Sequence, residues 1–173
     1  MEKRAGYLKR RIKVIKDYPK MGVNFKDMSS ILNDSKAFQY AIDLMAEKIK
    51  NLNYDALAGQ DVPALFGITL SYKLKKPFIM IHKKGTLPGE IIKKRFATEY
   101  AVEELEINPK LVEKNQKVIL VGYLIATGGT AESMEELIEK SGGKVIAFLY
   151  LIKQENFKFK LNKPLYSILT YKN

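Results

Sequence analysis

The segment from Val118 to Ser133 limits most strongly what this chain can fold into, because an apolar run leads into a glycine-rich turn and then into a helical pattern. Val118–Val121 reads as a buried strand, and Thr130–Lys140 carries apolar residues on one helical face. Between them, Gly128 and Gly129 let an anion approach the backbone N–H groups of the turn. The positive end of the helix points to the same place, so the segment predicts a phosphate site at the carboxyl end of a strand.

Apolar runs alternate with helical patterns along the rest of the chain. The expected strands cover residues 55–59, 77–81, 117–121, 144–153 and 165–171. The expected helices cover residues 9–17, 35–52, 63–74 and 130–140, with Ser35 as the N-cap of the second. Continuous apolar strands separated by helices are typical of a parallel sheet with both faces covered. We therefore expect an α/β fold, with a mainly parallel sheet flanked by helices, formed as a single domain by residues 1–173.

Two polar segments interrupt this alternation. Residues 18–32 read as a loop. The basic segment 83–98 is punctuated by Gly85, Pro88 and Gly89, which indicates a flexible loop of the kind that covers ligands.

The composition excludes several classes of site. The chain has no cysteine and a single histidine, His82, which excludes disulfide scaffolds, zinc ribbons and a cysteine nucleophile. We expect no metal ligands from the protein. The amino terminus lacks the apolar core of a signal peptide, and no run of 18 apolar residues occurs. A cytoplasmic protein without a membrane span is expected.

The net charge of +11 is distributed unevenly along the chain. Residues 1–26 hold nine Lys and Arg against two acids, and residues 73–95 hold eight against one. Residues 96–139 reverse the balance, with nine acids against three lysines. This asymmetry predicts a positive face that attracts polyphosphates, nucleic acid or an acidic partner. The alternative is that the lysines only keep the surface soluble.

The glycine-rich segment resembles a known phosphate motif. It has neither G-x-x-x-x-G-K-[ST] nor G-x-G-x-x-G. Four apolar residues, two variable positions, two apolar residues and then Ala-Thr-Gly-Gly-Thr resemble the motif that binds 5-phosphoribosyl 1-pyrophosphate (PRPP) in type I phosphoribosyltransferases. In that resemblance the 5′-phosphate would be held by Ala126, Thr127, Gly128, Gly129 and Thr130. The alternative is a turn of the same sequence that binds no ligand.

Other segments narrow the resemblance to the adenine phosphoribosyltransferases, over nearly all of residues 12–171. Residues 18–27 are similar to the family's base pocket, in which Val23 and Phe25 would flank the purine. Residues 83–89 and 98–100 resemble the flexible hood loop, with Glu99 at the position of the proposed proton donor. The resemblance implies the type I phosphoribosyltransferase fold, a homodimer, and the conversion of adenine and PRPP to AMP and pyrophosphate. Mg²⁺ would accompany the diphosphate.

Three departures from the family's pattern fall on the ribose and pyrophosphate subsites. Gly122 and Tyr123 occupy two positions where the family has acids that accept the ribose hydroxyls. Pro63 replaces an arginine that grips pyrophosphate, and the loop around it is one residue shorter. His82 stands where the hood loop has an arginine, and Thr86 where a lysine is common. Losing two charge-assisted hydrogen bonds removes roughly 3–6 kcal/mol, on the order of a hundred- to ten-thousand-fold in affinity or rate.

The departures define three hypotheses. Because the purine and 5′-phosphate subsites are kept, we expect AMP to bind to a homologue whose transferase activity is weak or lost. The first alternative is an active enzyme of purine salvage that uses adenine and PRPP, in which Lys93, Lys94, Arg95 or the basic amino terminus replaces the lost contacts. The second alternative is a nucleic-acid-binding regulator on the same scaffold, although no base-reading pattern favours it.

Overall fold

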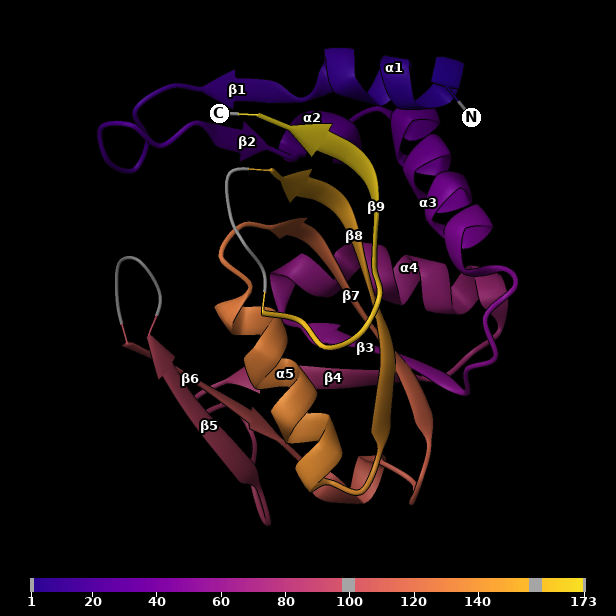
Figure 1. The fold of residues 1–173 in the computed structure, drawn as a ribbon, viewed down its shortest axis with the longest axis vertical. Helices are drawn as coiled ribbons and strands as arrows, with labels where there is room; N and C mark the ends of the chain where they lie inside the picture. The colour runs from indigo at the N-terminus through magenta and orange to yellow at the C-terminus, as the bar shows by residue number, and fades with distance from the viewer. Residues whose placement is uncertain (1, 98–101, 156–159, 173) are drawn as a thin grey trace.

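A seven-stranded sheet forms the centre of the protein in the computed structural model, which describes residues 2–97, 102–155 and 160–172 (Figure 1). The strand order is β5-β6-β4-β3-β7-β8-β9, in which β3, β4, β7, β8 and β9 are parallel and β6 pairs antiparallel with both β4 and β5. The strands are β3 (Ala56–Gln60), β4 (Phe78–Lys83), β5 (Ile92–Ala97), β6 (Val102–Ile107), β7 (Lys117–Ile125), β8 (Lys144–Gln154) and β9 (Leu165–Tyr171).

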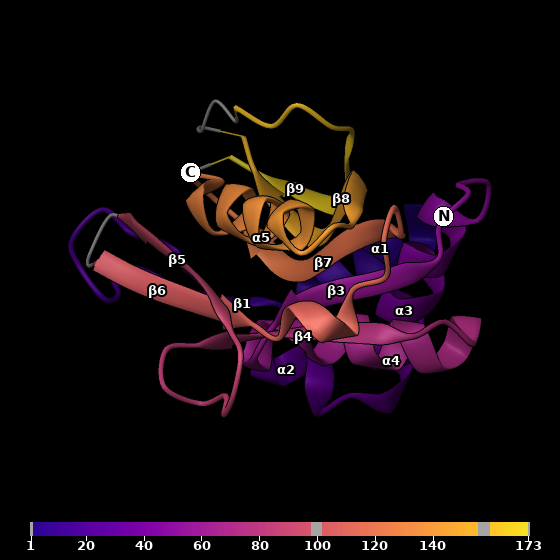
Figure 2. The ribbon, with the colours of Figure 1, turned by 90° about the horizontal axis from the view of Figure 1, so that it is seen from below.

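Helices cover both faces of this sheet (Figure 2). The α-helices are α1 (Glu2–Arg11), α2 (Ser29–Leu32), α3 (Ser35–Ile49), α4 (Leu65–Leu74) and α5 (Gly129–Lys140), with short 3₁₀ helices η1 (Val62–Ala64) and η2 (Pro109–Leu111). Helices α3 and α4 lie on one face and α5 on the other (Figure 2). The expected α/β fold with a mainly parallel sheet is therefore confirmed. Within the described residues no helix is long and apolar enough to cross a membrane.

The two faces of the sheet bury separate apolar layers. Ile119 and Val121 of β7 face the layer that contains α3, whereas Val118 and Leu120 face the layer that contains α5. This alternation follows from the two-residue period of a strand. Because both faces of the parallel strands are covered, the sequences of these strands are unbroken apolar runs.

The amino-terminal segment differs from the expectation. The helix predicted over residues 9–17 is wrong, because α1 begins at Glu2 and ends at Arg11. Leu8 is fully buried, and Arg4 Nη2 lies 2.6 Å from Glu47 Oε1 on α3, so contacts with α3 stabilise the earlier helix. The residues after it form β1 (Lys13–Ile15), which pairs antiparallel with β2 (Phe25–Asp27).

The loop predicted over residues 18–32 is therefore shorter than expected, since it ends in β2 and the four-residue helix α2. The N-cap of α3 also differs by one residue. Asp34, rather than Ser35, caps the helix, and its Oδ1 accepts a hydrogen bond of 3.0 Å from the Ala37 N–H. Both residue types are good N-caps, so the local sequence did not distinguish them.

The predicted flexible segment 83–98 contains regular structure. Its second half is β5, which forms an antiparallel hairpin with β6. Among the described residues of this segment, only residues 84–91 lack regular structure, and Glu106 of β6 holds this loop. The fully buried Glu106 carboxylate accepts hydrogen bonds of 2.8 Å from the Thr86 and Leu87 N–H groups. The alternating burial of β5 was hidden in the sequence by its three consecutive basic residues.

Candidate phosphate and ligand pocket

The turn after β7 presents an uncapped helix end. Strand β7 ends at Ile125, α5 begins at Gly129, and Gly128 is the N-cap with a φ of 91°. A positive φ of this kind is reached easily only by glycine. No side chain caps the first turn of α5, so its N–H groups are available to an anion. The local sequence folds in this way because the apolar run ends at Ile125 and Gly128 can adopt the positive φ that starts the helix.

A pocket with a volume of about 240 Å³ opens beside this turn. Four of the predicted phosphate-binding residues line the pocket: Ala126, Thr127, Gly128 and Thr130. Gly129, the first residue of α5, is not part of the lining. The complete lining is Gln60, Pro63, Val121, Gly122, Tyr123, Leu124, Ile125, Ala126, Thr127, Gly128, Thr130, Ala131, Met134 and Tyr150. None of these described side chains carries a charge, so the pocket can attract an anion only through backbone dipoles and neutral polar groups.

The floor of the pocket is a row of residues from three adjacent strands. In the register of β7 and β8, Gly122 pairs directly with Tyr150. The β3–β7 register ends with Ala58 opposite Leu120, and continuing it by two residues aligns Gln60 with Gly122. Neighbouring residues of parallel strands point to the same face of a sheet. Gln60, Gly122 and Tyr150 therefore share the face that α5 covers.

The Tyr150 ring occupies the space above Gly122. A Cβ atom at position 122 would lie 3.0 Å from Tyr150 Cδ1 and closer still to Cε1. Real Cβ atoms do not approach a ring so closely, so Tyr150 requires glycine at this position. Tyr150 is only 4% exposed, and burial raises the pKa of its hydroxyl well above the usual range. The phenol therefore stays neutral.

Tyr123 lies mainly on the opposite face. It packs against the apolar layer of α3 and α4, and burial raises the pKa of its hydroxyl. Its position at the end of β7 still lets it line one side of the pocket. The two positions that the resemblance assigns to acids thus face different surroundings here, and neither side chain bears a charge.

The end of β3 is connected to the end of β4 through Asp61. Asp61 has a φ of 35°, and its Oδ2 accepts a hydrogen bond of 2.9 Å from the Lys83 N–H. Asp61 Oδ1 lies 3.6 Å from His82 Nδ1. His82 does not line the pocket, whereas Pro63, in the 3₁₀ helix after Asp61, does. Pro63 contributes neither an N–H donor nor a charge.

The predicted base-binding residues lie apart from this pocket. Phe25 is the first residue of β2, and its ring packs edge-on against Tyr18 at 5.5 Å between ring centres. Val23 accepts a hydrogen bond of 3.0 Å from the Tyr18 N–H in the same hairpin. The hairpin passes over the carboxyl ends of β8 and β9 (Figure 1). The structure does not bring Val23 or Phe25 into the lining of the pocket, and Glu99 lies outside the described residues.

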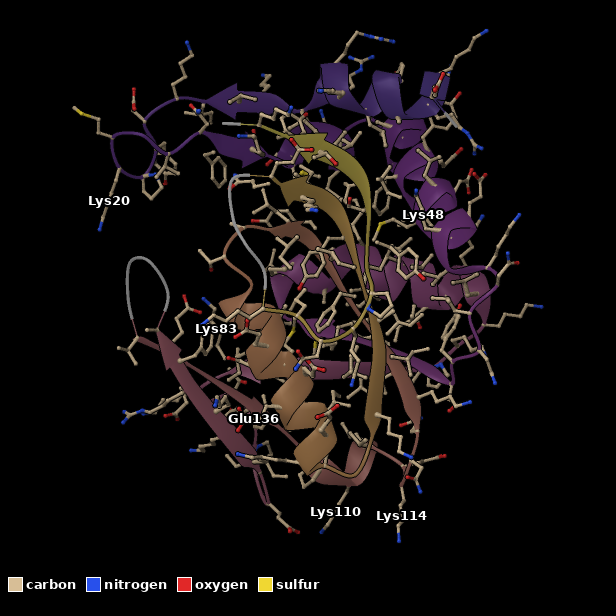
Figure 3. All side chains as sticks on the ribbon, viewed as in Figure 1. Lys20, Lys48, Lys83, Lys110, Lys114 and Glu136 are labelled. Atoms are coloured by element: carbon tan, nitrogen blue, oxygen red, sulfur yellow. The ribbon has the colours of Figure 1, made fainter. Side chains whose placement is uncertain are left out.

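The hairpin of β5 and β6 contacts the helix that carries the turn. A Cβ atom at Gly129 would lie 3.6 Å from the Ala97 carbonyl oxygen at the end of β5. Lys94 forms an ion pair with Glu136, which lies on the side of α5 toward this hairpin (Figure 3). Hydrogen bonds from Lys140 and then Lys94 keep the pKa of Glu136 below its usual value. These contacts place the hairpin beside the phosphate turn.

The described residues offer no metal centre of their own. No group of three or more His, Cys, Asp or Glu side chains within them could hold a metal ion. With Gly122 and Tyr123 at the two motif positions, the described lining of the pocket also lacks carboxylates, through which Mg²⁺ is usually bound.

Gln60 and Tyr150 are the two polar residues of the pocket lining that the sequence analysis missed. Tyr150 lies inside the apolar run 144–153, where an aromatic residue reads as core. Gln60 follows Gly59 at the end of the strand predicted over residues 55–59, and nothing local distinguishes it from a loop residue. Only the register of β3, β7 and β8 brings these two side chains to either side of Gly122.

Comparison with known proteins gives a consistent family. No protein-family model matches the chain. The adenine phosphoribosyltransferase of Thermosipho africanus is 41% identical over 143 residues, which are 82% of this chain and 84% of the relative. That of Clostridium novyi is 38% identical over 164 residues, 94% of this chain and 95% of the relative.

Solved structures agree with the sequence relatives. The adenine phosphoribosyltransferase of Thermoanaerobacter pseudethanolicus superposes with a TM-score of 0.93 at 32% identity, covering 96% of this chain and 99% of that one. The enzyme of Saccharomyces cerevisiae, solved with adenine and an imino-altritol bisphosphate, superposes with a TM-score of 0.88 at 28% identity, covering 97% of this chain and 99% of that one. This chain belongs to the adenine phosphoribosyltransferase family.

Proposed function

We propose that the protein binds a purine nucleoside 5′-monophosphate, AMP, at the turn between β7 and α5, and that transfer of a phosphoribosyl group to adenine is weak or absent. The observation that carries this proposal is the composition of the pocket. It retains an uncapped helix end for a phosphate, whereas none of its described lining side chains is charged. A phosphate monoester needs the first feature, and a diphosphate with its metal ion needs charges as well.

The expected loss can be estimated from the two positions at the end of β7. Hydrogen bonds to a carboxylate are worth about 1.5–3 kcal/mol each. With Gly122 and Tyr123 in place of two acids, the free energy of binding the ribose hydroxyls is therefore weaker by roughly 3–6 kcal/mol. The same loss corresponds to about a hundred- to ten-thousand-fold in rate if these bonds strengthen in the transition state.

An active adenine phosphoribosyltransferase is the second candidate, and the family supports it equally. The relatives that bear this name cover nearly the whole chain. Compensation by basic residues of the hairpin is restricted, because Lys94 pairs with Glu136 and Arg95 Nε lies 2.8 Å from Glu104 Oε2. An active enzyme would have to release these cations or recruit Lys93 when PRPP binds.

A steady-state assay with adenine, PRPP and Mg²⁺ separates the two candidates. Turnover within about tenfold of the ordinary enzyme rate of 10 s⁻¹ contradicts the proposal of weak transfer and establishes the second candidate. Turnover at least a hundredfold below that ordinary rate, together with AMP binding measured by calorimetry, supports the proposal.

A restored site provides the companion experiment. Gly122→Asp and Tyr123→Asp return both acids, but the Tyr150 ring occupies the space of a Cβ atom at position 122. The acids therefore have to be introduced together with Tyr150→Val. The triple variant should gain transferase activity, and Tyr150→Val alone is the matched control that should not.

We also propose a homodimer, as the resemblance implies. An apolar stripe on η1 and α4 supports it, since Val62, Leu65, Ile68 and Tyr72 are 73%, 41%, 40% and 87% exposed. Light scattering coupled to gel filtration tests this proposal, and Tyr72→Lys with Ile68→Lys should give a monomer. Binding of nucleic acid through the basic amino terminus stays a prediction, and retention on heparin without a steep salt dependence would remove it.

A further inference from the structure

A second groove lies at the amino-terminal side of the molecule, apart from the pocket beside the turn. It is bounded by the end of α1, the start of β1 and the segment from β2 to α3, and its volume is about 970 Å³. Helix α1, strand β1 and helix α2 lie together beyond one end of the sheet, away from the β5–β6 hairpin (Figure 1). The lining is Arg10, Arg11, Lys13, Asp27, Ser29, Ser30, Asn33, Asp34 and Ser35, none of which lines the pocket at the turn.

Asp34, one of the two acids in this groove, is engaged by the protein itself. Its Oδ1 accepts the hydrogen bond from the Ala37 N–H that caps α3. Its Oδ2 accepts a hydrogen bond of 2.9 Å from the Tyr7 hydroxyl and lies 3.0 Å from Arg11 Nε. Asp34 and Arg11 therefore balance one another, and the pair adds little net charge to the groove.

The other acid, Asp27, stands against two cations. Its Oδ1 accepts a hydrogen bond of 2.8 Å from the Ser29 N–H, and this bond, followed by the smaller effect of the Lys13 charge, lowers the pKa of Asp27. Arg10 and Lys13 are exposed, and no hydrogen bond or ion pair joins either side chain to another described residue. The groove is therefore positive, and it belongs to a segment, residues 1–26, with nine Lys and Arg against two acids.

The remaining lining is polar and small. The Asn33 and Ser35 side chains are exposed and form no hydrogen bond with another described residue. None of the described lining residues is aromatic or apolar. A protein that binds single-stranded nucleic acid without reading its sequence offers aromatic rings on which bases stack, and this lining offers none. Its cations and neutral donors suit phosphate oxygens alone.

We propose that this groove binds a chain of phosphate groups, of the class of inorganic polyphosphate, through the Arg10 guanidinium and the Lys13 ammonium. Asn33 and Ser35 donate to further phosphate oxygens. The site goes beyond the proposed function, because it shares no lining residue with the pocket at the turn. Two exposed cations hold a single phosphate weakly, whereas successive phosphates of one chain meet several donors at once. Affinity should therefore rise with chain length and fall steeply with salt.

Calorimetric titration with tripolyphosphate and with a longer polyphosphate tests the proposal, at about 50 mM and about 200 mM salt. Arg10→Gln with Lys13→Gln removes both charges, and Asn33→Asp adds a carboxylate with almost no change of shape. Lys48→Gln with Lys50→Gln is the matched control, because it removes two exposed charges at the other end of α3, where Figure 3 labels Lys48. Thermal melting checks that each variant is folded.

We expect the wild type to bind the longer chain more tightly than tripolyphosphate. The double variant at positions 10 and 13 should weaken binding by about three- to thirtyfold and reduce its dependence on salt. Asn33→Asp should weaken binding by about two- to tenfold, and the control by less than about twofold. Excess AMP should not displace the polyphosphate, because AMP is proposed to bind at the turn.

The proposal is overturned if the wild type binds no polyphosphate, if the double variant binds it like the control, or if excess AMP displaces it. Should the double variant not fold, Asn33→Asp decides in the same way. Single-stranded RNA that binds more tightly than polyphosphate of the same charge, and loses affinity in the double variant, would assign the groove to nucleic acid and also overturn the proposal. Failure of the wild type to bind AMP contradicts the proposed function alone and leaves the comparison of the groove variants intact.

Discussion

The turn that follows β7 is built from backbone, whereas the floor beside it is built from side chains. The turn depends on a positive φ at Gly128 and on the uncapped N–H groups of α5. The floor depends on which side chains occupy three positions of adjacent strands, Gln60, Gly122 and Tyr150. A backbone site survives most substitutions, but a site of side chains changes its chemistry with each one. The turn can therefore keep its geometry while the chemistry of the floor changes.

The largest expected effect tests the floor. Gly122→Asp places a Cβ atom against the Tyr150 ring and a carboxylate in a pocket without a cation. Overpacking costs about 1–3 kcal/mol and an unpaired buried charge adds to it, so we expect the free energy of unfolding to fall by roughly 3 kcal/mol. Urea unfolding followed by circular dichroism measures the change.

Tyr150→Val in the same chain should return a substantial part of that loss, because it removes the ring that meets the new Cβ atom. If Gly122→Asp alone is as stable as the wild type, Tyr150 does not require glycine at position 122, and the floor is less constrained than the structure indicates.

A smaller effect tests the turn. Gly128→Ala forces a side chain into a positive φ, which should lower the free energy of unfolding by about 1–2 kcal/mol and weaken AMP by about tenfold. Gly142 lies beyond the other end of α5 with a φ of 97°, so Gly142→Ala carries the same backbone cost away from the pocket. Calorimetry with AMP and with inorganic phosphate compares the two. Equal loss of affinity in both variants would show that the turn acts only through stability.

The smallest effect concerns residues 84–91, a backbone segment held by one carboxylate. The N–H of Leu87, followed by those of Gly85 and Thr86, lowers the pKa of Glu106. Because its folded pKa lies below the unfolded pKa of about 4.3, the Glu106 carboxylate stabilises the loop at every pH above the unfolded pKa. This stabilisation is lost as the pH falls through the lower folded pKa.

Amide exchange at Thr86 and Leu87 should therefore accelerate, beyond its intrinsic pH dependence, as the pH falls below about 4. Glu106→Gln should show faster exchange already at pH 7. Glu90→Gln is the control, because Glu90 belongs to the same loop and pairs at its surface with Lys110 at 3.3 Å. Unchanged exchange in Glu106→Gln would mean that the loop is held by other contacts.

The parallel strands and the helices that follow them could be predicted because each carries its own periodic pattern. The apolar run before Gly122 and the acidic solvent face of α5 are local signals of this kind. The early start of α1 could not be predicted, because Leu8 and Arg4 are ordered by α3, far along the chain. The strand β5 was missed for a similar reason, since its polar residues become regular only by pairing with β6.

The candidate site divides in the same way. The glycine-rich turn is a continuous stretch of sequence, and four of its five predicted residues line the pocket. That they bind a phosphate stays a prediction. Tyr150 was read as core, and Gln60 as the residue after a strand. Neither could be assigned to the pocket without the register that aligns them with Gly122.

The sequence by itself determined the parallel sheet and the glycine-rich turn after β7, and its motifs identified the family, because strand periodicity and glycine placement act over a few neighbouring residues. Only the tertiary structure decided what surrounds the two residues at positions 122 and 123. It places Gly122 under the Tyr150 ring, turns Tyr123 toward the opposite face, and brings Gln60 to the other end of the same row. The physical reason is that side chains from distant segments share a surface only after the strands have paired.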